Sequence, residues 1–136
     1  WRPIGNIHFL AGRLREAEAA YLKAFEDDPE DLNVNRNLAK LATNLQDYRA
    51  MIERYTRVAD LDPDHVADHY ANRCYAHIKL GEYELAVRDC TWAIDREPRK
   101  QSAYMNRAHA YGKLGLMAER QRDKQMLARL GGGDEE

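Results

Sequence analysis

Residues 70–98 decide the fold, and they read Tyr-Ala-Asn-Arg-Cys-Tyr-Ala-His-Ile-Lys-Leu-Gly-Glu-Tyr-Glu-Leu-Ala-Val-Arg-Asp-Cys-Thr-Trp-Ala-Ile-Asp-Arg-Glu-Pro. Two helical patterns lie on either side of Leu80-Gly81 in this stretch. Glycine accepts the left-handed backbone conformation that closes a helix, so Gly81 fits the turn between two helices. Pro98 ends the second pattern, because proline lacks a backbone donor and clashes with the preceding turn. The stretch therefore predicts one helical hairpin.

The hairpin recurs along the chain. Pro29, Pro63 and Pro98 each follow an acidic residue and lie 34 and 35 residues apart. A period of this length indicates stacked repeats, each of which needs its neighbours to bury its apolar face. Glycine also marks the turn in the first and last units, whereas the second unit reads Asn-Leu-Gln-Asp at positions 44–47. We therefore expect that one turn to be built differently.

The apolar pattern predicts eight helices in antiparallel pairs and no strand. The first helix of each pair is expected at about 1–11, 31–44, 66–80 and 100–114. The second is expected at about 14–27, 47–60, 83–96 and 117–130.

Composition and charge argue against several classes of protein. The chain has 136 residues, 32% of them charged, and a net charge of −2, so it is not an obvious nucleic-acid binder. No apolar run approaches the roughly 20 residues of a membrane-spanning helix, and no signal peptide is visible. Because Trp1 falls inside a repeat, we expect the sequence to be part of a longer chain. Two cysteines are too few for a disulfide framework and are compatible with a reducing compartment.

Residues 70–98 resemble a tetratricopeptide repeat almost throughout. The markers of that family here are Tyr70, Leu80-Gly81, Ala86, Ala93 and Pro98. The first unit matches it through Trp1, Ile4, Gly5, Ala17, Tyr21, Ala24 and Pro29. The fourth matches through Tyr104, Asn106-Arg107, Ala108, Tyr111 and Gly115, and then has Arg120 where a small alanine is expected. The second diverges most, with Asn35 at the aromatic position and Met51 at the small one.

The resemblance implies an all-α fold, an α–α superhelix (right-handed solenoid) of antiparallel helix pairs. We expect one repeat domain at 1–130, in units of about 1–30, 31–64, 65–99 and 100–130, and a flexible acidic tail at 131–136. Within it we expect the aromatic markers to be core residues. We also expect Cys74 and Cys90 to be small packing residues.

In this family the first helix of each pair lines a concave face that binds ligands. Carried over by position, the resemblance implies a peptide-binding groove made of Arg2, Asn6, Arg36, Asn37, Lys40, Asn44, Asn72, Tyr75, Lys79, Asn106, His109 and Lys113. Asn37, Asn72 and Asn106 recur 35 and 34 residues apart, so they occupy one equivalent position in successive units. Their amides could pair with the backbone of an extended peptide, or they could tie neighbouring helices together.

Charge favours an acidic partner. Cations outnumber acids on the projected concave face as a whole, where Asp68 is the one acidic residue. We therefore predict a protein-protein interaction module that binds an extended, acidic peptide or partner segment. The alternatives are a self-associating structural scaffold and an accessory repeat domain of a larger enzyme.

Several other functions are not expected. Some domains of this family grip a chaperone's C-terminal carboxylate with a clamp of lysine, asparagine and arginine. Asp68 and Asn72 fall where that clamp needs cations, so we predict no chaperone-tail function. His65 and His69 lie four residues apart but are expected to be ordinary surface histidines. With no phosphate-binding loop and no nucleophile paired with a base, we expect no catalytic residue, cofactor or metal.

Overall fold

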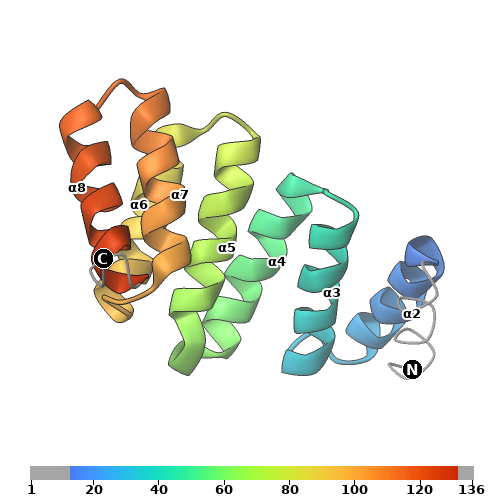
Figure 1. Ribbon diagram of the computed structural model, residues 1–136. Coiled ribbons are helices and arrows are strands. Elements are labelled where there is room, and N and C mark those ends of the chain that lie inside the picture. Colours follow the sequence, from blue (N-terminus) through green and yellow to red (C-terminus); the bar gives the residue numbers. More distant parts are fainter. Residues whose placement is uncertain (1–12, 132–136) are drawn as a thin grey trace. The chain divides into compact units, whose positions relative to one another are not determined.

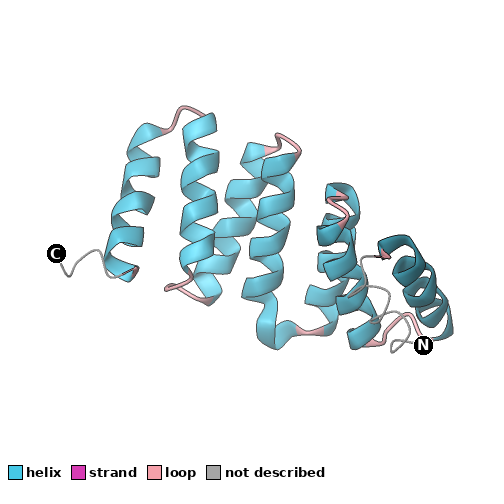
Figure 2. Ribbon diagram, turned by 45° about the vertical axis from the view of Figure 1, so that its right-hand side comes forward, coloured by secondary structure: helices cyan, strands magenta, loops and turns pink. Residues whose placement is uncertain are grey.

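The computed structural model describes residues 13–131, in which helices are joined by short turns and loops and no strand is present (Figures 1 and 2). The elements are α2 (Leu14–Asp27), α3 (Leu32–Asn44), α4 (Tyr48–Leu61), the 3₁₀-helix η1 (Pro63–His65), α5 (Val66–Lys79), α6 (Tyr83–Arg96), α7 (Gln101–Lys113) and α8 (Met117–Leu130). Each α-helix lies within one residue of its predicted range, so the all-α prediction of antiparallel helix pairs is confirmed. The predicted helix at 1–11 lies outside the described residues.

The chain divides into two compact units, Trp1–Pro63 and Asp64–Glu136. In unit 1, α3 packs against both α2 and α4. Its core includes Tyr21, Leu38 and Leu41, all nearly inaccessible to solvent. In unit 2, α5 pairs with α6 and α7 with α8, while α7 also packs on both helices of the preceding pair.

The turns inside the three described hairpins have the same geometry. Gly81 and Gly115 both have φ of 77°, and Gln46 takes the same left-handed conformation with φ of 56°. In each turn the following backbone N–H donates to the carbonyl five residues before it, at 2.8–2.9 Å. The expectation that the Gln46 turn would be built differently is therefore wrong. The hydrogen bonds of the turn outweigh the cost of a side chain in the left-handed region.

The loops between hairpins explain why the second unit can lack its aromatic residue. Tyr104 donates its hydroxyl to the carbonyl of Pro98 at 2.8 Å. Asn35, at the equivalent position, donates its Nδ2 to the carbonyl of Pro29 at 2.9 Å and to that of Asp31 at 2.9 Å. Both donors close the loop over the proline that ends the preceding helix, so the asparagine performs the tyrosine's hydrogen-bonding role.

The α5–α6 hairpin is held together covalently. The Sγ atoms of Cys74 on α5 and Cys90 on α6 form a disulfide, with Cα atoms 5.5 Å apart, and neither side chain is accessible to solvent. The prediction that both are small residues at a close helix contact is confirmed, but treating them as separate packing residues was wrong. A Cα separation of 5.5 Å lies within the range that a disulfide needs.

Candidate functional site

The predicted groove residues of unit 2 lie on one face of α5 and the matching face of α7. Asn72, Tyr75 and Lys79 follow each other at intervals of three and four residues along α5, so they share a face. Asn106, His109 and Lys113 repeat that arrangement on α7. Because α5 and α7 pack directly against each other, the two sets lie on adjacent helices. We call these six residues the inner face of unit 2.

Among the described residues, the two asparagine amides of the inner face take no part in the hydrogen bonds of the fold. Asn72 and Asn106 are half-buried, yet neither amide hydrogen-bonds to any other described residue. Asn37 on α3 in unit 1 is also half-buried, and its amide forms no hydrogen bond to another described residue. A half-buried amide with unused donors and acceptor can pair with an incoming backbone. This observation favours the peptide-binding interpretation over helix-to-helix ties.

Charge on the inner face is concentrated toward the C-terminal ends of α5 and α7. Lys79 and Lys113 are exposed, and Lys79 Nζ lies 5.4 Å from the centre of the Tyr75 ring. The acidic residue Asp68, near the start of α5, forms an ion pair with Lys100 before α7. That acid is therefore balanced within the fold, and the two lysines leave a net positive charge.

In unit 1 the predicted residues lie on α3 and are less uniform. Arg36 Nη2 donates to Asp62 Oδ2 at 3.0 Å, so its charge is partly balanced. Asn44 donates its Nδ2 to the carbonyl of Lys40 at 2.9 Å, whereas the Lys40 side chain is exposed. The predicted residues Arg2 and Asn6 lie outside the described residues.

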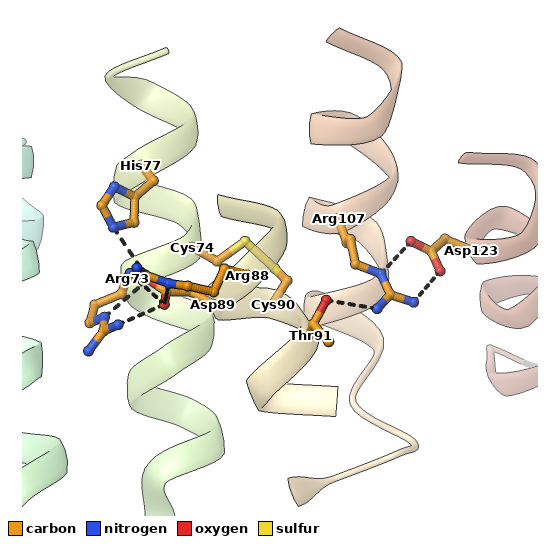
Figure 3. The surroundings of a disulfide bond; sticks show 9 residues. All are labelled: Arg73, Cys74, His77, Arg88, Asp89, Cys90, Thr91, Arg107 and Asp123. Atoms are coloured by element: carbon orange, nitrogen blue, oxygen red, sulfur yellow. Dashed lines mark hydrogen bonds and ion pairs between the residues drawn. A yellow bond between two sulfur atoms is a disulfide. The ribbon is translucent and has the colours of Figure 1, made fainter. Parts of the chain in front are cut away.

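A buried polar network, which sequence reasoning missed, lies beside the disulfide (Figure 3). Arg73 on α5 donates to both carboxylate oxygens of Asp89 on α6, at 2.7 Å and 3.1 Å. Arg88 approaches the same carboxylate at 3.3 Å, and His77 Nε2 lies 3.3 Å from Asp89 Oδ2. Asp89 is fully buried, so this carboxylate depends entirely on its cationic neighbours.

The network sets the protonation of His77 and Asp89. Burial by itself would lower the pKa of His77, but its contacts with Asp89 and with Glu82, at 2.8 Å, outweigh burial and raise that pKa. Burial would likewise raise the pKa of Asp89, but the contacts with His77 and Arg73 outweigh it and lower that pKa. Both shifts favour a charged cluster between α5 and α6.

The α7–α8 hairpin contains a counterpart of the Arg73–Asp89 ion pair. Arg107 on α7 donates to both oxygens of Asp123 on α8 at 2.7 Å and 2.8 Å, and to Thr91 Oγ1 on α6 at 3.1 Å. The hydrogen bonds to Asp123 raise the pKa of Arg107. The signal was present in the sequence, because both arginines and both aspartates are 34 residues apart, and each arginine precedes its aspartate by 16.

The expectation that His69 is a surface residue can also be compared with the structure. His69 is 7% exposed, so the expectation of a surface histidine there is wrong. Within residues 13–131, no group of three or more histidine, cysteine, aspartate or glutamate side chains gathers where a metal could bind. No helix in the described part of the chain is long and apolar enough to cross a membrane.

Comparison with known proteins supports the repeat architecture. The family model for the tetratricopeptide repeat matches residues 35–65, which cover most of α3, all of α4 and η1. The Oryza sativa subsp. japonica protein SGT1 homolog is 39% identical over 72 residues, which are 53% of this chain and 19% of that protein. The chain matches 16–25% of the length of this and other curated relatives.

Solved structures show the same fold. A structure of MamA superposes with a TM-score of 0.87 at 16% identity, covering 98% of this chain and 76% of that one. The first TPR of Spaghetti (RPAP3), solved bound to the HSP90 peptide SRMEEVD, superposes with a TM-score of 0.68 at 24% identity. That match covers 73% of this chain and 80% of the other.

Antiparallel helix pairs with left-handed turns, repeated every 34 or so residues, define a helical-repeat domain. Residues 35–65 match the tetratricopeptide repeat family, and the other described hairpins repeat the same architecture, so the described residues form tetratricopeptide-type repeats.

Proposed function

We propose that this chain binds an extended, acidic segment of another protein, and that the inner face of unit 2 contacts it. The observation that carries the proposal is the pair of unused, half-buried amides of Asn72 and Asn106 on adjacent helices. Each amide can donate to a backbone carbonyl and accept from a backbone N–H, which gives affinity without reading side chains. We propose no catalytic step for this chain.

Lys79 and Lys113 supply the preference for acidic segments. Both side chains are exposed, and neither forms an ion pair with a described residue. They would attract a negatively charged segment over several ångströms and raise its rate of association. The Lys40 side chain offers the same chemistry on α3 of unit 1.

The relative bound to SRMEEVD supports an acidic peptide as the ligand class. This chain departs from the chaperone-tail clamp at Asp68, whose charge is occupied by Lys100. We therefore propose that recognition depends on the acidic side chains and the peptide backbone, and that a free C-terminal carboxylate is not required.

Isothermal titration calorimetry with three peptides tests the proposal. The peptides are SRMEEVD, the same peptide with an amidated C-terminus, and SRMQQVN, in which the acids become amides. We expect the first two to bind with similar affinity and the third to bind at least about tenfold more weakly. No binding of SRMEEVD at millimolar concentration would refute the acidic-peptide proposal, and binding that amidation abolishes would show a carboxylate clamp instead.

Variants locate the site. Replacing both amides, in Asn72→Ala/Asn106→Ala, removes hydrogen bonds worth about 1 kcal/mol each. Affinity for SRMEEVD should therefore fall about 30-fold. Gln125→Ala is the matched control, because it removes an exposed amide from α8. Equal affinities for wild type and the asparagine variant would show that the peptide binds elsewhere.

A further inference from the structure

The α5–α6 hairpin has an end face that α7 covers. Ala71 and Cys74 on α5, together with Ala86 and Cys90 on α6, are buried in one apolar cluster. Ala103 and Ala110 of α7 complete that cluster, and both are inaccessible to solvent. These small residues let α7 lie close against the hairpin, so this end face is shaped to hold a helix.

The α7–α8 hairpin presents the same end face without a helix on it. The residues 34 positions further along line an open hollow of about 540 Å³: Met105, Ala108, His109, Gly112, Lys113, Met117, Arg120, Lys124 and Leu127. Met105 and Met117 are 58% and 56% exposed, respectively. The hollow therefore has the register of a helix-binding surface, and no described element covers its methionines.

The hollow also differs in charge from its counterpart. Arg120 and Lys124 stand where the covered face has Ala86 and Cys90. Neither cation forms an ion pair or hydrogen bond within the described part of the chain. Lys113, whose side chain is exposed, adds a third cation to the lining of the hollow. The two small neutral residues that contact α7 in the covered face are thus replaced in the hollow by two cations that have no partner among the described residues.

Arg120 is accommodated by the neighbouring helix. A Cβ on Gly112 would lie 3.1 Å from Arg120 Cδ, so the absence of a side chain at Gly112 makes room for the arginine stem. The methylene groups pack against α7 while the guanidinium remains available to a partner. The departure from the repeat pattern at Arg120 thus belongs to the lining of the hollow.

We propose that this end face binds an amphipathic, acidic helix of another protein. Its apolar side would contact Met105, Met117 and Leu127, and its carboxylates would pair with Arg120 and Lys124. A helix fits because the equivalent face of the preceding hairpin holds α7. Acidic side chains fit because the cations have no described partner. This surface shares His109 and Lys113 with the inner face but includes neither of its asparagine amides.

The probe is a peptide derived from α7 itself, because α7 occupies the equivalent position in the preceding hairpin. A helix-stapled, fluorescent peptide of residues 101–113 carries Ala103→Glu and Ala110→Glu, which places carboxylates where alanines contact the neutral face. The unmodified stapled peptide is its control. Fluorescence anisotropy with the whole chain should show saturable binding of the glutamate peptide, and at least about tenfold weaker binding of the control.

Variants of the chain complete the test. Arg120→Glu/Lys124→Glu should weaken the glutamate peptide at least tenfold, whereas Arg122→Glu, on α8 but outside the hollow, should not. Circular dichroism confirms that each variant is folded. Asn72→Ala/Asn106→Ala should leave this affinity unchanged, so failure of the inner-face proposal and failure of this one are separable.

Three outcomes would overturn the proposal. The first is that the glutamate peptide does not bind, or binds the double-glutamate variant as tightly as wild type. The second is that sedimentation shows a dimer that this variant dissociates, which makes a second copy the occupant. The third is that the peptide binds only after residues 132–136 are deleted, which makes the chain's own acidic segment the occupant.

Discussion

The buried Arg73–Asp89 pair should carry a large share of the stability of unit 2. Asp89→Asn keeps the shape of the side chain but removes its charge and one acceptor. It removes the carboxylate to which Arg73 donates two hydrogen bonds, in a site where the Arg73 side chain is only 11% exposed. Breaking such a buried pair from one side costs about 3–5 kcal/mol. Arg88 and His77 lose the same partner, which favours the upper half of that range.

The equivalent pair in the last hairpin provides an internal comparison. Arg107 is 17% exposed and also donates to Thr91, so it keeps one partner when Asp123 changes. Asp123→Asn should therefore cost about 2–3 kcal/mol, clearly less than Asp89→Asn.

Urea denaturation followed by circular dichroism at pH 7 measures both costs. With a slope of about 2 kcal/mol per molar urea, a loss of 4 kcal/mol lowers the midpoint by roughly 2 M. The double replacement Arg73→Met/Asp89→Leu should recover most of the loss, because an apolar pair removes both desolvated charges. A cost below about 1 kcal/mol for Asp89→Asn, or a double variant as unstable as the single one, would refute this reasoning.

Other features of the fold lead to further predictions. The raised pKa of His77 means that its stabilisation is fully present below its unfolded pKa of 6.5 and is lost as pH rises through the higher folded value. Unfolding free energy should therefore fall on going from pH 6 to alkaline pH in wild type, and this dependence should be absent in His77→Gln. The lowered pKa of Asp89 acts in the opposite direction, so its stabilisation is lost as pH falls below the unfolded value of 3.8 through the folded one, and Asp89→Asn should flatten the acid limb. Gln46→Gly should raise the unfolding free energy by about 1 kcal/mol, because glycine adopts a φ of 56° without steric cost; an unchanged urea midpoint would contradict this. The disulfide between Cys74 and Cys90 closes a short loop, so its reduction should lower the free energy of unfolding by about 3 kcal/mol. Thiol titration of the unfolded, unreduced chain should find no free thiol.

The helices could be predicted from the sequence because their ends are set by local chemistry. Proline at 29, 63 and 98 and glycine at 81 and 115 restrict or permit the conformation of the local backbone. Helix ends at these residues can therefore be predicted without knowledge of the tertiary structure. The turn at Gln46 was misjudged for the same reason. Its left-handed conformation is imposed by hydrogen bonds that join the two helices, and such bonds cannot be read from residue preference.

The candidate site was only partly predictable. Register placed Asn72 and Asn106 on equivalent positions, but that their amides are unused is known only from the hydrogen bonds of the fold. The Arg73–Asp89 pair was visible as a spacing, yet its partners on two helices become evident only once α5 and α6 are packed. The end-face hollow depends on the contrast between a covered hairpin and an open one, which is a tertiary property.

The disulfide has a mechanical consequence for a chain pulled from its two ends. A helical hairpin under tension unravels and lengthens, but the 16-residue span between Cys74 and Cys90 is bypassed by the covalent bond. At about 3.3–3.6 Å per residue, roughly 50 Å of contour length is then withheld from extension. Tension would pass through α5 and α6 along the sulfur bridge, while the α3–α4 and α7–α8 hairpins, which have none, could extend completely. A reducing agent would release the missing length in a single step, so the redox state of one bond sets how far this chain can stretch.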